Sequence, residues 1–133
     1  KLTAELADGT NTWMVGPKTM EDHINPCFEA SGNYSPEIVA GMPIVLTNNI
    51  DHARESIGKS LAVYGQLPSY RAMLDREGAD GPADIAIIGD ENKLGGEIKR
   101  LESLGVTDFN AAIMDVEDGA YHRTLEFLGS LRP

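Results

Sequence analysis

Residues Ile38 to Thr47 form a nearly continuous apolar run, Ile-Val-Ala-Gly-Met-Pro-Ile-Val-Leu-Thr. A strand with one wet face alternates apolar and polar side chains, and this run does not alternate. The run therefore predicts a strand that is buried on both faces within a parallel sheet. Pro43 has no N–H to donate, so we expect a bulge or an early end to pairing on one side of this strand.

Shorter strand patterns alternate with helical patterns along the rest of the chain. The stretch from Gly9 to Pro17 predicts a first strand, Ile85–Ile88 a short extended segment, and Val106–Met114 the last strand. We expect helices over Thr19–Ser31, Asn48–Tyr64, Tyr70–Glu77, Asp90–Leu104 and from Asp118 onward. Strands that alternate with helices indicate an α/β fold with parallel strands and right-handed crossovers.

The expected helix starts all carry a residue that commonly caps helices. These residues are Thr19, Asn48, Ser69, Asp90 and Asp118. Two helices also show apolar stripes that should face the core. The first stripe consists of Leu94, Ile98, Leu101 and Leu104, and the second of Tyr121, Leu125, Leu128 and Leu131. Gly95 and Gly96 weaken the first of these helices, which suggests either close packing on a neighbour or plain tolerance.

Composition sets the class of protein and limits its partners. The chain has 133 residues, of which 41% are hydrophobic, so residues 1–133 are expected to form a single domain segment with its own core. The net charge of −10 argues against nucleic acid and anionic membranes as partners. No apolar run is long enough to span a bilayer. The single Cys27 cannot form an internal disulfide, which favours a reducing, cytoplasmic location.

The only tryptophan, Trp13, lies between the turn signals Asp8-Gly9 and Gly16-Pro17. A large aromatic residue at the end of a strand, followed by a loop and a helix, is typical of a site at the carboxyl edge of a parallel sheet. Trp13 could equally be a core residue. Tyr64, Tyr70 and Arg71 occupy a long connection that could cover such a site, or could simply join two helices.

Motifs for other chemistry are missing from the sequence. It contains no zinc-ligand spacing, Walker loop, dinucleotide-binding glycine motif or nucleophile elbow. His23, His52 and His122 have polar neighbours and are interpreted as surface residues. We therefore expect no metal site, and no general acid or base can be assigned.

Three segments carry a resemblance to a known family. Glu5-Leu-Ala-Asp-Gly-x-x-Thr-Trp-x-x-Gly-Pro17 resembles the sixth strand of the bacterial-luciferase-like monooxygenases, a superfamily that includes deazaflavin (coenzyme F-420)-dependent oxidoreductases. Ile87-Ile-Gly-Asp-Glu91 and Leu104-Gly-Val-Thr-Asp-Phe109 resemble its approach to the eighth strand. Tyr64-Gly-Gln-Leu-Pro-Ser-Tyr-Arg-Ala-Met-Leu-Asp-Arg-Glu-Gly78 resembles the long seventh connection of the deazaflavin branch.

The resemblance implies a (β/α)8 TIM barrel of which this chain is the C-terminal part, about strands six to eight. It implies hydride transfer between deazaflavin coenzyme F-420 and an organic small-molecule substrate in the intact barrel. The implied cofactor wall is Trp13 with Thr12, Met14, Gly16 and Pro17. The implied substrate pocket is Thr47, Asn48, Tyr64, Tyr70, Arg71 and Met114, with Asp115 beside Met114 at the mouth of strand eight.

The opening residues Lys1 to Asp8 read as the end of a helix that runs into the first strand, so we expect the chain to be part of something larger. The partner would be the N-terminal barrel half or another copy of the chain, and the chain alone would be inactive. Met42 to Leu46 is apolar where sulfonate-cleaving relatives carry Arg and His, so sulfonate chemistry is not expected. The alternatives are an FMN-dependent monooxygenase of the same fold, a self-assembling half-barrel without activity, and a flavodoxin-like domain.

Overall fold

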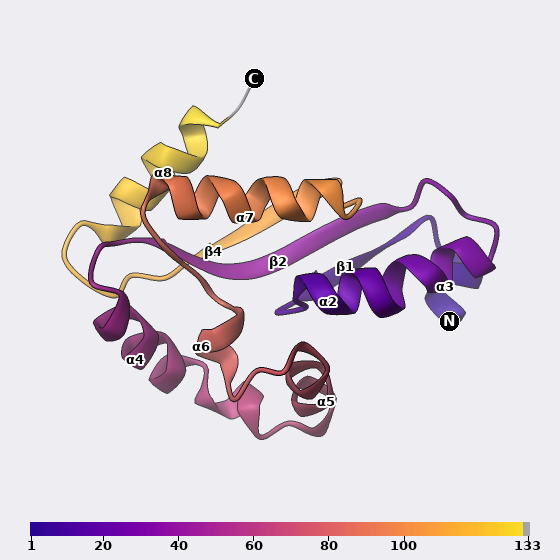
Figure 1. Ribbon diagram of the computed structural model, residues 1–133, viewed down its shortest axis with the longest axis horizontal. Coiled ribbons are helices and arrows are strands. Elements are labelled where there is room, and N and C mark those ends of the chain that lie inside the picture. The colour runs from indigo at the N-terminus through magenta and orange to yellow at the C-terminus, as the bar shows by residue number, and fades with distance from the viewer. Residues whose placement is uncertain (132–133) are drawn as a thin grey trace.

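The computed structural model describes residues 1–131 (Figure 1). Its strands are β1 (Gly9–Trp13), β2 (Glu37–Leu46), β3 (Ile87–Gly89) and β4 (Asp108–Ile113). Its α-helices are α1 (Leu2–Leu6), α2 (Pro17–Thr19), α3 (Asn25–Ala30), α4 (Ile50–Ser60), α5 (Pro68–Glu77), α6 (Pro82–Ile85), α7 (Glu91–Ser103) and α8 (Ala120–Ser130). A π-helical turn (Met20–Ile24) joins α2 to α3, and a 3-10 turn (Ala62–Gly65) precedes α5.

Strand β2 is the centre of a fully parallel sheet. It pairs with β4 over Val39–Ile44, with β1 over Glu37–Gly41 and with β3 over Ile44–Leu46. The expected parallel α/β sheet is therefore present. A flavodoxin-like sheet would place its first strand between the second and third. Here β2 lies between β1 and β4, so that alternative is wrong.

The proline in β2 coincides with a break in pairing. Alternate residues of a strand direct their hydrogen-bonding groups to opposite edges. The Gly41 carbonyl accepts from Met14 N at 2.8 Å, and Thr47 N donates to the Gly89 carbonyl at 2.9 Å. The backbone groups of odd-numbered residues in β2 therefore point to the edge shared by β1 and β3. On that edge β1 has ended at Gly41 and β3 begins at Ile44. The N–H that Pro43 lacks would have pointed into this break, which confirms the expected local loss of pairing.

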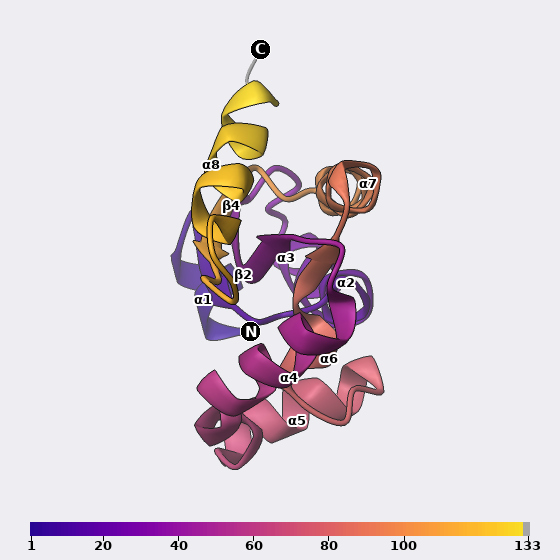
Figure 2. The ribbon, with the colours of Figure 1, turned by 90° about the vertical axis from the view of Figure 1, so that its left-hand side faces the viewer.

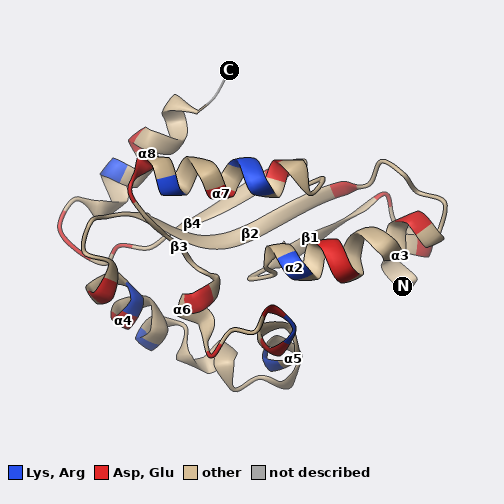
Figure 3. Ribbon diagram, in the orientation of Figure 1, with Lys and Arg blue, Asp and Glu red and all other residues tan. Residues whose placement is uncertain are grey.

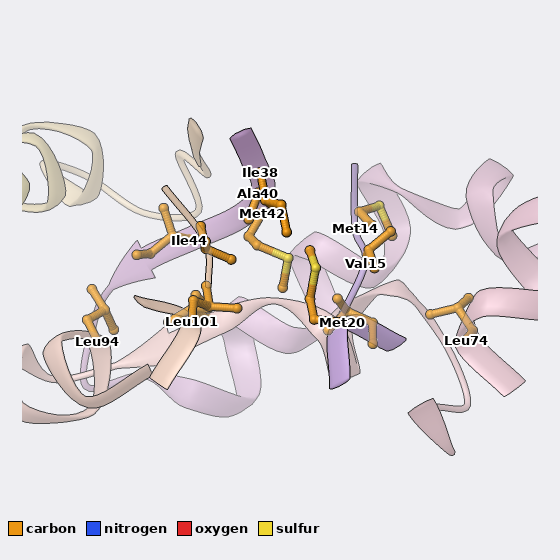
Figure 4. Close-up of a cluster of buried hydrophobic side chains, with 13 residues drawn as sticks. Met14, Val15, Met20, Ile38, Ala40, Met42, Ile44, Leu74, Leu94 and Leu101 are labelled. Carbon is orange, nitrogen blue, oxygen red and sulfur yellow. The ribbon is translucent and has the colours of Figure 1, made fainter. Parts of the chain in front are cut away.

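One face of the sheet carries the main core (Figure 4). Ile38, Ala40, Met42 and Ile44 of β2 point to this face and are all at most 2% exposed. Leu94 and Leu101 of α7 pack on them, which confirms the apolar stripe expected for that helix. A Cβ on Gly95 would lie 3.9 Å from Phe127 of α8, an ordinary contact, and a Cβ on Gly96 would meet open space, so neither glycine is required by close packing.

The opposite face of the sheet is largely uncovered toward the amino ends of its strands. Register aligns Asn11, Val39 and Asp108 in one row across β1, β2 and β4. The next row is Trp13, Gly41 and Asn110. Asn11, Asp108 and Asn110 are exposed. A second, smaller core covers only the carboxyl end of this face, where Val45 and Ile88 meet Ala53, Ile57 and Ala120.

The helices divide into two groups around β2. In both views α7 and α8 lie above β2, whereas α4, α5 and α6 lie below it (Figure 2). The lower group belongs to the long connection between β2 and β3. That connection returns to β2 along the same edge that β1 uses.

Several helix starts differ from the sequence-based expectation. Asp90 caps α7 as predicted, because its side chain accepts from Lys93 N at 2.8 Å. Thr19 does not cap a helix: it is buried within the α2 segment, whose N-cap is Gly16. Asn49 takes the place predicted for Asn48. The caps predicted at Ser69 and Asp118 are also wrong, since the N-cap of α5 is Leu67 and that of α8 is Gly119.

The apolar stripe predicted to point inward on α8 is confirmed only for Leu128, which packs against the main core, and is wrong for its other three members. Tyr121, Leu125 and Leu131 are 43%, 49% and 45% exposed, whereas Ala120 and Thr124 are fully buried. The Thr124 hydroxyl donates to the Ala120 carbonyl at 2.7 Å and accepts from Leu46 N at 2.9 Å. These two small residues let α8 approach β2 closely, and that approach turns the bulky side chains outward.

Glu77 at the end of α5 replaces the cap that Gly16 cannot supply. Its carboxylate accepts from Lys18 N at 3.2 Å, from Thr19 N at 2.6 Å and from the Thr19 hydroxyl at 2.5 Å. A Cβ on Gly16 would lie 2.5 Å from Glu77 Cδ, so glycine leaves room for this carboxylate. The contact ties the long connection to the segment that follows β1.

We predict that Glu77→Ala lowers the free energy of unfolding by about 2 kcal/mol, since hydrogen bonds to a charged acceptor contribute about 1.5–3 kcal/mol each. Urea unfolding followed by circular dichroism measures the change. Glu102→Ala is the matched control, because Glu102 is exposed and makes no side-chain hydrogen bond in the described residues. Equal midpoints for the two variants would contradict the role given to Glu77.

Candidate functional site

The backbone leaves β1 through an unusual conformation. Met14 has φ 57°, in the left-handed region, and is the non-glycine residue with positive φ in the described chain, residues 1–131. That conformation costs about 1–2 kcal/mol for an L-residue. It is held by the bond from Met14 N to the Gly41 carbonyl and by a side chain only 1% exposed. Such strain often accompanies functional sites.

Trp13 lies directly before this strained residue and rests on β2. A Cβ on Gly41 would approach the indole Cε3 to 3.1 Å and the Thr12 carbonyl oxygen to 2.7 Å. Glycine at position 41 therefore allows the indole to lie against the strand. Thr12, the residue before Trp13, donates its hydroxyl to the Val39 carbonyl at 3.1 Å. Two contacts to β2 thus fix the end of β1.

Trp13, Tyr64 and Tyr70 form an aromatic cluster. The rings of Trp13 and Tyr64 meet edge to face with centroids 6.2 Å apart, and those of Tyr64 and Tyr70 do so at 4.8 Å. Edge-to-face pairs at these separations are attractive because the positive ring edge meets the negative ring face. The structure therefore brings together three of the residues that the sequence analysis selected.

The indole Nε1 of Trp13 is buried and has no hydrogen-bond partner. A buried donor without an acceptor costs about 1–3 kcal/mol, and each such group calls for an explanation. An acceptor atom on a bound molecule would satisfy it. The aromatic cluster thus combines flat apolar rings with one buried donor that lacks an acceptor, and a bound molecule could reach that donor only after a covering side chain moves.

We predict that Tyr64→Ala shifts the emission of Trp13 to longer wavelength, because water reaches the indole when its cover is removed. Trp13 is the only tryptophan, so the spectrum reports this site alone. Tyr34→Ala is the control, since Tyr34 is 79% exposed and lies outside the cluster. Identical spectra for the two variants would show that Tyr64 does not shield Trp13.

Thr47 and Asn48 lie in a different place, at the carboxyl end of β2. Both line a cavity of about 450 Å³ that Asp90, Glu117 and Arg123 also line. The buried Thr47 hydroxyl donates to Glu117 Oε1 at 2.8 Å, and Arg123 Nη2 donates to the same oxygen at 2.8 Å. The cavity therefore has a fixed polar wall that can offer both hydrogen-bond donors and acceptors.

The other residues selected from the sequence are placed separately. Met114 packs on the smaller core at the carboxyl end of the sheet, and Asp115 after it is exposed. Arg71 donates to Asp75 at 2.8 Å, to the Asp80 carbonyl at 2.9 Å and to the Ala79 carbonyl at 2.6 Å. Those bonds hold the end of α5 and the loop behind it, so the guanidinium is already engaged.

Gly16 and Pro17 line a third space, a cavity of about 510 Å³ that we call the gap cavity. It is distinct from both the aromatic cluster and the polar cavity at the end of β2. The site residues predicted from the sequence therefore lie in several separate places, and Trp13, Tyr64 and Tyr70 form one cluster of aromatic contacts. Within residues 1–131, no cluster of three or more His, Cys, Asp or Glu residues could hold a metal ion.

Sequence reasoning missed the partners that shape these sites. Glu117 bonds to Thr47 from 70 positions away, and Arg123 bonds to the same Glu117 oxygen; no local sequence pattern predicts the contact with Thr47. Asn110 was read only as part of a strand, yet register puts it in the row of Trp13 and Gly41. Strand register across β2 is the signal that could have found it, and register was not available from the sequence.

Asp84 on the rim of the gap cavity has a pKa below its ordinary value. Burial acts to raise that pKa, but hydrogen bonds from Gly81 N–H and the Arg54 guanidinium outweigh the burial and lower it. Asp84 therefore stays charged and pairs with Arg54 at neutral pH.

Because its pKa is lowered in the folded state, the Asp84 carboxylate stabilises the protein above the unfolded pKa of about 3.9. This stabilisation is lost as the pH falls through the folded pKa. We predict that Asp84→Asn lowers the unfolding midpoint at pH 7 and that the difference disappears in strong acid. Thermal unfolding between pH 7 and pH 3 measures it. Asp115→Asn is the exposed control, and a deficit of Asp84→Asn that stays constant with pH would contradict the charge-based account.

Comparison with known proteins supports the fold. No protein-family model matches the chain, and neither does any curated protein. Among solved structures, an F420-dependent secondary alcohol dehydrogenase in complex with an F420–acetone adduct matches 99% of the chain with a TM-score of 0.67 and 17% identity. A coenzyme F420-dependent tetrahydromethanopterin reductase from Methanopyrus kandleri matches 96% with a TM-score of 0.67 and 16% identity.

The structural neighbours are thus coenzyme F420-dependent oxidoreductases, one of them captured with an F420 adduct. At these identities the likeness establishes a shared fold. The chain spans 45% of the length of each of the two proteins. The described residues contain no helix that is long and apolar enough to cross a membrane.

Proposed function

We propose that this chain supplies the last strands, about six to eight, of a luciferase-like (β/α)8 barrel that binds deazaflavin coenzyme F420. The intact barrel would transfer a hydride between that cofactor and a small organic molecule. Support comes from the match over nearly the whole chain to F420-dependent oxidoreductases. The resemblance of the segment from Glu5 to Pro17, which contains Trp13, to the sixth strand of this superfamily adds to it. The chain's share of 45% of those proteins fits a part of such a barrel.

The unpaired indole N–H of Trp13 is the observation that carries this proposal. In barrels of this kind the ligand lies at the carboxyl ends of the strands. Trp13 ends β1, and it lies in the row with Gly41 and Asn110 on the face opposite α7. A planar cofactor there would cover the indole and give its donor an acceptor.

The residues of this chain would bind the cofactor, orient it relative to the substrate and shield both from water. A bound deazaflavin supplies the hydride chemistry itself. Trp13 would form the wall beside the ring system, and Thr12, Met14, Gly16 and Pro17 would hold the end of β1 from behind that wall, because Met14 is buried in the main core and Gly16 and Pro17 line the gap cavity. Tyr64 and Tyr70 would exclude water from that wall. Thr47, Asn48 and Met114 would lie toward the substrate, and Asn110 would add an amide that can donate or accept.

Completion of the barrel would need further strands. Among the described strands, β1, β3 and β4 each pair on one edge only, with β2. Open parallel edges and an uncovered sheet face favour pairing with more strands. We propose that these come from an N-terminal barrel half or from a second copy of the chain.

We predict that F420 quenches the emission of Trp13 in a saturable way and that FMN does so less at equal concentration. The cofactor ring would stack near the indole, and deazaflavin is the cofactor that the neighbours use. A fluorescence titration, on a sample whose mass is measured by light scattering, tests both the binding and the assembly state.

Asn110→Ala should weaken F420 binding by about tenfold, which corresponds to 1.4 kcal/mol for one lost polar contact. Asn92→Ala is the control, since Asn92 is an exposed residue on α7 without a side-chain hydrogen bond in the described chain. The absence of quenching by either cofactor, in a sample that has assembled into a dimer or larger species, would favour a half-barrel that assembles without activity.

That alternative has its own support. Open strand edges and the exposed Tyr121, Leu125 and Leu131 of α8 are features of a surface that associates with another chain. It differs from the redox proposal in one measurable respect: assembly would occur without any cofactor binding. Tighter binding of FMN than of F420 would instead favour the FMN-dependent monooxygenase of the same fold.

A further inference from the structure

The gap cavity arises from the way in which two strands share one edge of β2. The pairing of β1 ends at Gly41, and that of β3 starts at Ile44. The chain leaves the sheet through Gly16 and Pro17 and returns through Ala86, and these residues line the cavity. Met42 of β2 is part of the lining and faces the helix-covered side of the sheet. The cavity is therefore separate from the face that carries the row of Trp13.

The cavity concentrates positive charge in an acidic chain. The sequence has 11 Lys and Arg residues and a net charge of −10. Four of the basic residues line this one cavity, namely Lys18, Arg54, Lys93 and Arg100. Figure 3 shows basic residues on α2, α4 and α7, the helices from which these side chains come. Three acidic residues also line the cavity, so its lining has one more basic than acidic residue, whereas the chain as a whole is strongly acidic.

The three acidic residues of the lining are already engaged. Glu77 accepts from the backbone of α2 and from a threonine hydroxyl. Asp84 accepts from Arg54 and from the N–H of Gly81 at 3.1 Å. Glu97 accepts from Lys93 at 2.7 Å. The carboxylates therefore serve the protein's own structure.

Two cations retain free hydrogen-bonding capacity. Lys18 forms no salt bridge within residues 1–131, and it is held in place because its own backbone N–H binds Glu77. Arg100 approaches Glu97 only to 3.9 Å, which is beyond hydrogen-bond distance. An ammonium and a guanidinium, both strong donors for anionic oxygens, thus line the same cavity without a close acceptor.

The remaining lining is uncharged. Its large apolar side chains are Met42, Ile50, Ile85, Ile87, Ile88 and Leu101. A volume of about 510 Å³ lies within the usual range for small-molecule sites, roughly 300–1,000 Å³. A ligand that satisfies both parts of the lining has an apolar body and an anionic head.

We propose that the gap cavity binds a small phosphate monoester with an apolar body, whose anionic group meets Lys18 and Arg100 and whose body lies on Ile87 and Leu101. The site lies on the helix-covered side of the sheet, so it does not depend on the barrel being complete or on F420. Its failure would leave the proposed function untouched.

Isothermal titration of the full chain with phenyl phosphate tests the site. Binding of phenyl phosphate should be tighter than that of inorganic phosphate, which lacks the apolar body, and tighter than that of benzyl alcohol, which lacks the charge. Raised salt should weaken it. Lys18→Gln and Arg100→Gln should each weaken binding by about tenfold, the loss expected for one charged hydrogen bond.

Lys99→Gln is the matched control, because Lys99 neighbours Arg100 on α7 but does not line the cavity. It should leave binding unchanged. Absent binding at millimolar phenyl phosphate would overturn the proposal, as would equal binding of benzyl alcohol or inorganic phosphate. An equal effect of Lys99→Gln and Lys18→Gln would also overturn it, because general attraction of an anion would then explain the result. Circular dichroism of each variant confirms that the fold is intact.

Discussion

The pairing of β2 with three other strands is the interaction on which the rest of this structure depends. β2 receives β4 along one edge and β1 and β3, end to end, along the other. Both faces of a strand in that position must be apolar or small, and its sequence from Ile38 to Leu46 meets this demand. Gly41 and Pro43 add two local conditions: room for the Trp13 ring and a break in pairing where no N–H is needed.

These conditions link the fold to its candidate sites. Because β1 stops at Gly41, Trp13 lies at mid-length on β2 and is covered by the long connection through Tyr64. The same early stop opens the gap cavity between β1 and β3. The uncovered face, the aromatic cluster and the gap cavity are thus three consequences of one arrangement of strands around β2.

Much of this arrangement could be predicted from the sequence, because it depends on local patterns. The apolar run of β2, the helical spacing of Leu94 and Leu101 and the cap at Asp90 are all present as predicted. Aromatic residues near a strand end also identified the cluster of Trp13, Tyr64 and Tyr70. For the strand, the stripe and the cap, the physical cause lies within a few residues of its effect, whereas the contact of Trp13 with Tyr64 joins residues far apart in the sequence.

The failures share a different cause, which is contact between distant segments. Thr19 looks like a helix cap, but Glu77 from α5 supplies the acceptor instead and draws Thr19 into the interior. The bulky stripe of α8 looks like a core face, but Ala120 and Thr124 permit a closer approach to β2. The bond between Thr47 and Glu117 likewise depends on where α8 begins in space. Local propensity could not reveal these three contacts, because tertiary packing overrides it.

The pairing of β2 can be measured directly by nuclear Overhauser effects in the isotope-labelled protein. The account predicts contacts between the backbones of Trp13 and Gly41, of Ile88 and Val45, and of Ala111 and Met42. It further predicts that Pro43 shows backbone contacts to Ala112 of β4 and none to β1 or β3. Backbone contacts between β1 and β4, or a continuous β1 along the whole of β2, would contradict the arrangement from which the candidate sites follow.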